Sequence, residues 1–167
     1  RAQLGAEVEV RREHLERGRV DRGDVDGVAD HAAAEHVGDL LAALAALPKG
    51  AAKLILYTRA PVDRDLLRGF ESVDIEIKGG LSDAQLAADL KRCDLVALPS
   101  IAEGFGLVIL EAMACGVPVL CTTSTGGADF IKHHQNGLLI APGSAALIEQ
   151  ELAWSLTHRD ELFQMGQ

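Results

Sequence analysis

Short apolar runs alternate along this chain with longer segments of helical character. The apolar runs are rich in Leu, Ile and Val and predict buried strands at residues 53–58, 73–78, 94–98, 117–121 and 137–141. Helices are predicted at residues 27–47, 62–70, 83–92, 106–115, 129–134 and from residue 145 onward, and Ser82 with Gln85 forms a capping box at the start of the third. This alternation predicts an α/β fold, in which crossover helices cover both faces of a doubly wound parallel sheet.

The chain divides at about residue 26. Residues 1–26 form a charged N-terminal segment with a candidate first strand at residues 6–10. Residues 27–167 are interpreted as one domain, and a chain of 167 residues is long enough for one full hydrophobic core. The first residue is Arg1 rather than Met, so we expect the sequence to be a piece of a longer protein.

Glu103 and Glu111 are the only charged residues between positions 95 and 121. Glu111 falls within a predicted helix that is apolar on all sides and is therefore expected to be buried, where an ionised carboxylate needs a partner. Glu103 precedes the N-terminus of the same helix, where backbone N–H groups attract anions. The loop of Glu103 follows a predicted strand, as does the pair Gly126 and Gly127, so both loops are expected to line one crevice.

The spacing of the two glutamates fits an elongated ligand. Eight residues of helix span about 12 Å, so the two carboxylates could face the same side and bind opposite ends of such a molecule. A nucleotide-diphosphate sugar has this shape, with hydroxyl groups at both ends and phosphates between them. The alternative is a generic α/β domain with a half-buried pair of glutamates.

The stretch E-G-F-G-L-V-I-L-E, from Glu103 to Glu111, and the following A-M-A-C-G-V-P-V resemble the E-x7-E signature of retaining glycosyltransferases with the GT-B fold. The closest resemblance is to family 4, the glycosyl transferases group 1. Residues 124–129 (S-T-G-G-A-D) and 136–143 (N-G-L-L-I-A-P-G) resemble that family's glycine loop and last strand, so the resemblance covers about residues 50–166. It implies the Rossmann-like, C-terminal donor-binding half of such an enzyme.

The resemblance also implies a role for each site residue. Glu103 is expected to bind hexose hydroxyl groups and is the predicted catalytic residue, whereas Glu111 is expected to bind the ribose hydroxyl groups. Backbone N–H groups of the intervening loop are expected to face the hexose and the diphosphate, at Gly104, Phe105, Gly106 and Leu107. Gly126 and Gly127 either present backbone N–H groups to the donor or form a tight turn between a strand and a helix.

In the related enzymes, a Gly-Arg pair after the first strand and a later lysine neutralise the diphosphate. Arg19, which follows Gly18, and Arg22 resemble the first half of this pattern and are predicted donor ligands. Asp26 stands where the lysine is expected. A second alignment of the pattern uses Arg12 and Arg17 instead. The alternative to both alignments is a solvated charged segment that binds no phosphate.

The implied activity is transfer of a hexosyl group from a nucleotide-diphosphate sugar with retention at the anomeric carbon, without a metal or other cofactor. The acceptor-binding N-terminal domain is missing from this chain, so the isolated domain is expected to be inactive. One alternative, which the missing lysine favours, is a non-catalytic nucleotide-sugar-binding or regulatory module. A nucleotide-sugar epimerase of similar fold is a further alternative.

Net charge, apolar run length and cysteine content limit the classes of partner and the cellular location that we expect. The net charge of −9 argues against nucleic acid as a partner. No apolar run reaches the length of a membrane span. Peripheral association of the full enzyme with a membrane is compatible with both observations. The three cysteines lie in core-like segments, which favours reduced thiols and a cytoplasmic location. His133 and His134 are adjacent in a predicted helix, so they are expected to point apart as surface residues rather than share a metal.

Overall fold

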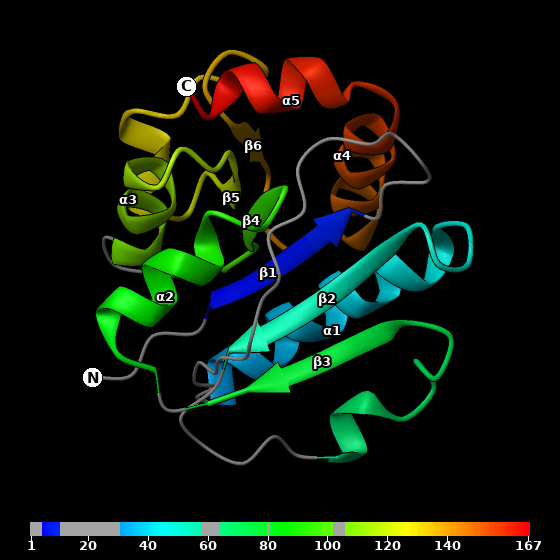
Figure 1. Ribbon diagram of the computed structural model, residues 1–167. Coiled ribbons are helices and arrows are strands. Elements are labelled where there is room, and N and C mark those ends of the chain that lie inside the picture. Colours follow the sequence, from blue (N-terminus) through cyan, green and yellow to red (C-terminus); the bar gives the residue numbers. More distant parts are fainter. Residues whose placement is uncertain (1–4, 11–30, 58–63, 80, 102–105) are drawn as a thin grey trace.

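The computed structural model describes residues 5–10, 31–57, 64–79, 81–101 and 106–167 (Figure 1). Within these residues, one sheet has the strand order β3-β2-β1-β4-β5-β6. The strands are β1 (Gly5–Val10), β2 (Ala52–Tyr57), β3 (Asp74–Lys78), β4 (Leu95–Leu98), β5 (Val119–Thr122) and β6 (Leu138–Ile140). The helices are α1 (His31–Ala46), α2 (Asp83–Leu90), α3 (Leu107–Ala114), α4 (Ala145–Thr157) and α5 (Arg159–Met165), with 3-10 helices η1 (Arg64–Leu67) and η2 (Gly126–Asp129).

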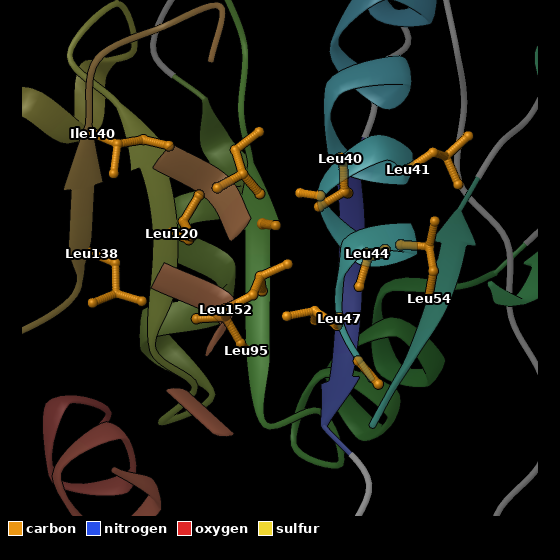
Figure 2. Close-up of a cluster of buried hydrophobic side chains, with 14 of the residues drawn as sticks. Leu40, Leu41, Leu44, Leu47, Leu54, Leu95, Leu120, Leu138, Ile140 and Leu152 are labelled. Carbon is orange, nitrogen blue, oxygen red and sulfur yellow. The ribbon is translucent and has the colours of Figure 1, made fainter. Parts of the chain in front are cut away.

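Helices cover both faces of the sheet, which confirms the predicted α/β class. Alternate residues of β4, β5 and β6 enter two separate cores. On β4, for example, Leu95 packs with residues of α1, α4 and α5, whereas Val96 packs with residues of α2 and α3. Figure 2 shows the first of these cores, where leucines of α1 and α4 meet those of the strands.

The five strands predicted most clearly all run in one direction, but the central strand β1 runs against them (Figure 1). It pairs antiparallel with β2 on one side and with β4 on the other. The sheet is therefore mixed rather than wholly parallel. The side-chain pattern of a strand is the same in both directions, and an antiparallel ladder is at least as favourable, so periodicity does not predict strand direction.

Three predicted helices differ in the structure. Within the described residues, the helix predicted at residues 62–70 is present only as the 3-10 helix η1. Residues 129–134 do not form a helix, because η2 ends at Asp129 and a turn follows in which His134 has a φ of 58°. The helix predicted from residue 145 is interrupted at His158, which separates α4 from α5. The capping box is present as predicted: Gln85 N–H donates to Ser82 Oγ over 3.4 Å, and Ser82 N–H donates to Gln85 Oε1 over 3.0 Å. In the described part of the chain, no helix combines the length and apolar character needed to cross a membrane.

Candidate functional site

Two glycine loops follow β4 and β5: the first is described only up to Ile101 and from Gly106, and the second contains Gly126 and Gly127, and their described glycines lie close together. Gly106 opens α3 with a φ of 66°, a left-handed conformation that favours glycine. A Cβ at Gly106 would lie 3.1 Å from Cδ1 of Ile109, and a Cβ at Gly127 would lie the same 3.1 Å from that atom. The Ile109 side chain therefore contacts both loops. The structure brings Gly106, Leu107, Gly126 and Gly127 together at one edge of the sheet.

Buried hydroxyl groups hold the second loop in place. Thr122, at the end of β5, donates from Oγ1 to the Ser100 carbonyl, which ties the carboxyl ends of β4 and β5 together. The same Oγ1 accepts the Ser124 N–H over 3.3 Å, and Thr125 Oγ1 donates to the Thr122 carbonyl over 2.8 Å. These threonines were not among the predicted site residues, although polar residues directly after an apolar strand are a readable signal.

Cys121 fills the space beneath Gly127. A Cβ at Gly127 would lie 2.6 Å from Cys121 Sγ, so only glycine fits at this position without a shift. Burial raises the pKa of the Cys121 thiol, and a hydrogen bond with Thr125 opposes this only in part. The thiol is therefore protonated near neutral pH and acts as a small packing group rather than as a nucleophile.

Glu111 is exposed, and its predicted burial is wrong. Helix α3 packs one face on the sheet through Ile109 and Ala112, which are fully buried. Its other face is open, with Leu107 54% and Leu110 40% exposed beside Glu111. An apolar composition therefore did not require burial on all sides. Within the described residues the Glu111 carboxylate makes no hydrogen bond or ion pair, so it has no structural partner.

The N-terminus of α3 contributes positive potential to this edge of the sheet. Gly106 is the N-cap residue and has no side chain with which to cap the first turn. Backbone N–H groups in the first turn of a helix lack intrahelical acceptors and attract anions. The leading end of α3 is thus a suitable neighbour for a phosphate or carboxylate group.

Five predicted site residues lie outside the described residues: Glu103, Gly104, Phe105, Arg19 and Arg22. The direction of β1 bears on the two arginines. Val10, the last described residue before them, pairs with Ala52, the first residue of β2, whereas both glycine loops follow the carboxyl ends of the parallel strands. The chain therefore leaves β1 at the amino ends of the neighbouring strands, opposite to the carboxyl ends where the candidate site lies.

A buried charged cluster at the ends of β2 and β3 did not emerge from the sequence. Asp89 of α2 is 5% exposed and pairs with Lys78 Nζ over 3.3 Å and with Arg92 Nη1 over 3.1 Å. The Tyr57 hydroxyl donates to the same carboxylate over 3.4 Å. These contacts fix α2 against the two strands. Lys78 Nζ also lies 3.6 Å from Glu76 Oε1, so the charges of this cluster compensate one another as a network.

A Rossmann-like α/β domain with glycine loops at the carboxyl ends of its strands is the class of protein that this structure defines. A model of the glycosyl transferases group 1 family matches residues 71–167, which is more than half of the chain and includes both loops and α3. The chain therefore belongs to the glycosyl transferases group 1 family. The match confirms the family that the motif from Glu103 to Glu111 predicted.

Individual relatives agree. D-inositol 3-phosphate glycosyltransferase from Pseudarthrobacter chlorophenolicus is 47% identical over 62 residues, which are 37% of this chain and 15% of that protein. Anabaena Alr3699/HepE, solved in complex with UDP-glucose, superposes with a TM-score of 0.68 at 25% identity, over 84% of this chain and 40% of that one. The C-terminal domain of LpcC, a glycosyl transferase group 1 family protein from Francisella tularensis, also gives a TM-score of 0.68, at 22% identity, over 80% of this chain and 75% of that one.

These neighbours are glycosyltransferases with the GT-B fold, and the predicted fold is confirmed. The resemblance to the LpcC domain supports the fold alone. The chain spans only 15% of the length of the Pseudarthrobacter relative, and 28% of that of a D-inositol 3-phosphate glycosyltransferase from Nocardia farcinica.

Proposed function

We propose that this chain is the donor-binding half of a glycosyltransferase and binds a nucleotide-diphosphate sugar at the edge formed by α3 and the two glycine loops. The observation that carries the proposal is the contact of both loops with Ile109, because it brings the start of α3 close to Gly127 at the carboxyl ends of β4 and β5. The unpaired, exposed carboxylate of Glu111 belongs to the same helix. The structural neighbour Anabaena Alr3699/HepE, solved in complex with UDP-glucose, supports this class of ligand.

The chemistry follows from the charge that develops on the donor. When the bond between the sugar and the diphosphate breaks, the leaving diphosphate gains negative charge. Backbone N–H groups at the start of α3 are oriented before the reaction and stabilise that charge at little reorganisation cost. Glu103 orients the hexose through its hydroxyl groups, and the reaction retains the configuration at the anomeric carbon. Arg19 and Arg22 supply further positive charge.

The acceptor is bound by a domain outside this chain, so the isolated domain binds the donor without transferring sugar. The free cysteines Cys93, Cys115 and Cys121 suit a reducing compartment, which supports a cytoplasmic full-length enzyme. A second candidate is a nucleotide-sugar-binding module without catalytic activity. It is favoured by Asp26, which stands in place of a phosphate-binding lysine, and by the direction of β1, which leads the chain away from the site.

Calorimetric titration of the purified domain with a panel of UDP-, GDP- and ADP-sugars tests the proposal. We expect one nucleotide series to bind and free hexoses not to bind. Glu111→Ala should weaken nucleotide binding about tenfold or more, because each charged hydrogen bond to a ribose hydroxyl contributes about 1.5–3 kcal/mol. Glu149→Ala, which removes an exposed glutamate from α4 on the opposite face of the sheet, is the matched control and should bind normally.

Failure of every nucleotide sugar to bind would contradict the proposal. Equal affinity of Glu111→Ala and the unmodified domain would remove Glu111 from the site. If the full-length protein binds a donor but transfers no sugar to any acceptor, the second candidate is correct.

A further inference from the structure

A cluster of three side chains, from His133, His134 and Glu151, lies at the amino end of β6. The glycine loops lie at the other, carboxyl ends of the strands. The two histidines lie in the turn between η2 and β6, and Glu151 lies in α4. The left-handed backbone of His134 (φ 58°) lets both rings face the same carboxylate. Nε2 of His133 lies 3.9 Å from Oε1 of Glu151, and Nε2 of His134 lies 3.2 Å from Oε2. The expectation that these histidines point apart is therefore wrong.

The Glu151 carboxylate depends on these rings. Glu151 is 2% exposed, and its Oε2 accepts no hydrogen bond within the described residues. His134 Nε2 is therefore close to Oε2, but the geometry of the contact is not that of a hydrogen bond. Oε1 accepts a hydrogen bond of 3.3 Å from the Gln150 side chain. A buried carboxylate in this position favours neighbours that carry a proton or a positive charge.

The His133 ring also binds the edge of the sheet. Leu139 N–H, on the edge strand β6, donates to His133 Nδ1 over 3.1 Å. An acceptor nitrogen has no proton, so the proton of the neutral ring resides on Nε2, the atom that faces Glu151. The ring therefore occupies the place that a neighbouring strand would take, and it satisfies an N–H group that an edge strand otherwise leaves unpaired.

This tautomer argues against a metal centre. The three residues offer ligand atoms within 4.8 Å of one another, a spacing that a metal ion could bridge. A metal on His133 Nε2 requires the ring proton on Nδ1, as in most histidine ligands. That proton would point at Leu139 N–H, and two donors would face each other. A second proton on the neutral ring meets the same obstacle, because it too must enter at Nδ1.

We propose that His133 is an acid-sensitive latch on the edge strand β6. The neutral ring accepts the Leu139 N–H and thereby holds the turn against β6, and protonation at Nδ1 breaks this hydrogen bond. Phe130 and Ile131, at the start of this turn, donate their N–H groups to the Gly127 carbonyl over 3.1 and 2.7 Å. Release of the latch therefore loosens the chain directly behind a candidate-site loop.

The electrostatic surroundings agree with this direction. Burial lowers the pKa of His133 from its ordinary value of 6.5, and the neighbouring His134 lowers it further, whereas Glu151 opposes the shift. Among the described residues, the titratable groups that face the ring are Glu151 of α4 and the neighbouring His134. A lowered pKa means that the folded state prefers the neutral ring. Its contribution to stability is present above pH 6.5 and is lost as the pH falls below that value.

Nuclear magnetic resonance of the nitrogen-15-labelled protein tests the latch without any mutation. Long-range proton–nitrogen spectra above pH 6.5 should show His133 as the neutral ring with its proton on Nε2. As acid titrates the ring, the exchange protection of the Leu139 amide, relative to the unfolded chain, should fall about fivefold, the equivalent of one ordinary hydrogen bond. A proton on Nδ1 above pH 6.5, or Leu139 protection that is independent of pH, would overturn the proposal.

Two variants sharpen the test. His133→Asn places an amide oxygen near the position of Nδ1 and does not titrate, so Leu139 should stay protected in acid. His158→Asn removes a different exposed ring, at the C-terminal end of α4, and should leave the acid response unchanged. A titration with zinc chloride above pH 6.5 is expected to show no stoichiometric binding. Zinc binding at one site that His133→Asn abolishes would identify a metal centre instead and overturn the latch.

Discussion

Gly127→Ala tests how closely the loop after β5 packs on Cys121 and Ile109 in the candidate site. A Cβ at Gly127 would lie 2.6 Å from Cys121 Sγ, 3.1 Å from Ile109 Cδ1 and 3.2 Å from Thr125 Oγ1. Real Cβ atoms essentially never approach another heavy atom within 3.0 Å, and Cys121 is fully buried, so the backbone or the thiol must shift. We expect this overpacking to cost about 2 kcal/mol of folding free energy, within the range for a group added to a close-packed core.

Urea denaturation and thermal unfolding measure this cost. A loss of about 2 kcal/mol lowers the unfolding temperature by roughly 4–8 °C in a domain of this size. Gly38→Ala is the matched control, because Gly38 lies in α1 and a Cβ there would have no atom within 4 Å. That variant should be more stable by about 0.5–1 kcal/mol, since alanine restricts the unfolded chain and favours a helix.

A double variant separates steric conflict from other causes. Cys121→Ala removes the sulfur that Gly127→Ala would meet, so the two substitutions should compensate one another. The double variant should be more stable than the sum of the single effects by about 1 kcal/mol or more. Additive effects, or a Gly127→Ala domain as stable as the original, would refute the close packing of Gly127 on Cys121.

Two further predictions concern the ligand and the pH response. Glu103→Ala should weaken binding of the nucleotide sugar but hardly change binding of the free nucleoside diphosphate, because its proposed partner is the hexose; calorimetry with both ligands decides this, and equal losses would contradict it. The Lys53 side chain hydrogen-bonds the Glu76 carboxylate and lowers the pKa of Glu76 below its ordinary 4.5, so this pair stabilises the fold above pH 4.5 and the stability is lost as acid titrates the carboxylate. Lys53→Met should flatten this part of the stability–pH curve, and an unchanged acid response would disprove the assignment.

Local patterns in the sequence determined much of this protein. The apolar runs predicted five strands within one or two residues of their observed bounds, because a short run of Leu, Ile and Val has few other ways to leave water. Ser82 and Gln85 predicted a helix start that depends only on neighbouring backbone groups. The motif from Glu103 to Glu111 identified the family. Each of these signals lies within about ten residues, and its physical cause lies within the same span.

Long-range contacts decided the rest. The direction of β1 depends on how distant segments connect, since a strand offers the same hydrogen-bonding groups in either direction. The exposure of Glu111 depends on which face of α3 meets the sheet, and apolar composition alone does not specify that face. The meeting of His133 with Glu151 required a left-handed residue in a turn and a helix that follows later in the chain. Side chains separated in sequence acquire common chemistry only when packing brings them together, so neither the proton latch nor the shared contact at Ile109 could be predicted from sequence spacing.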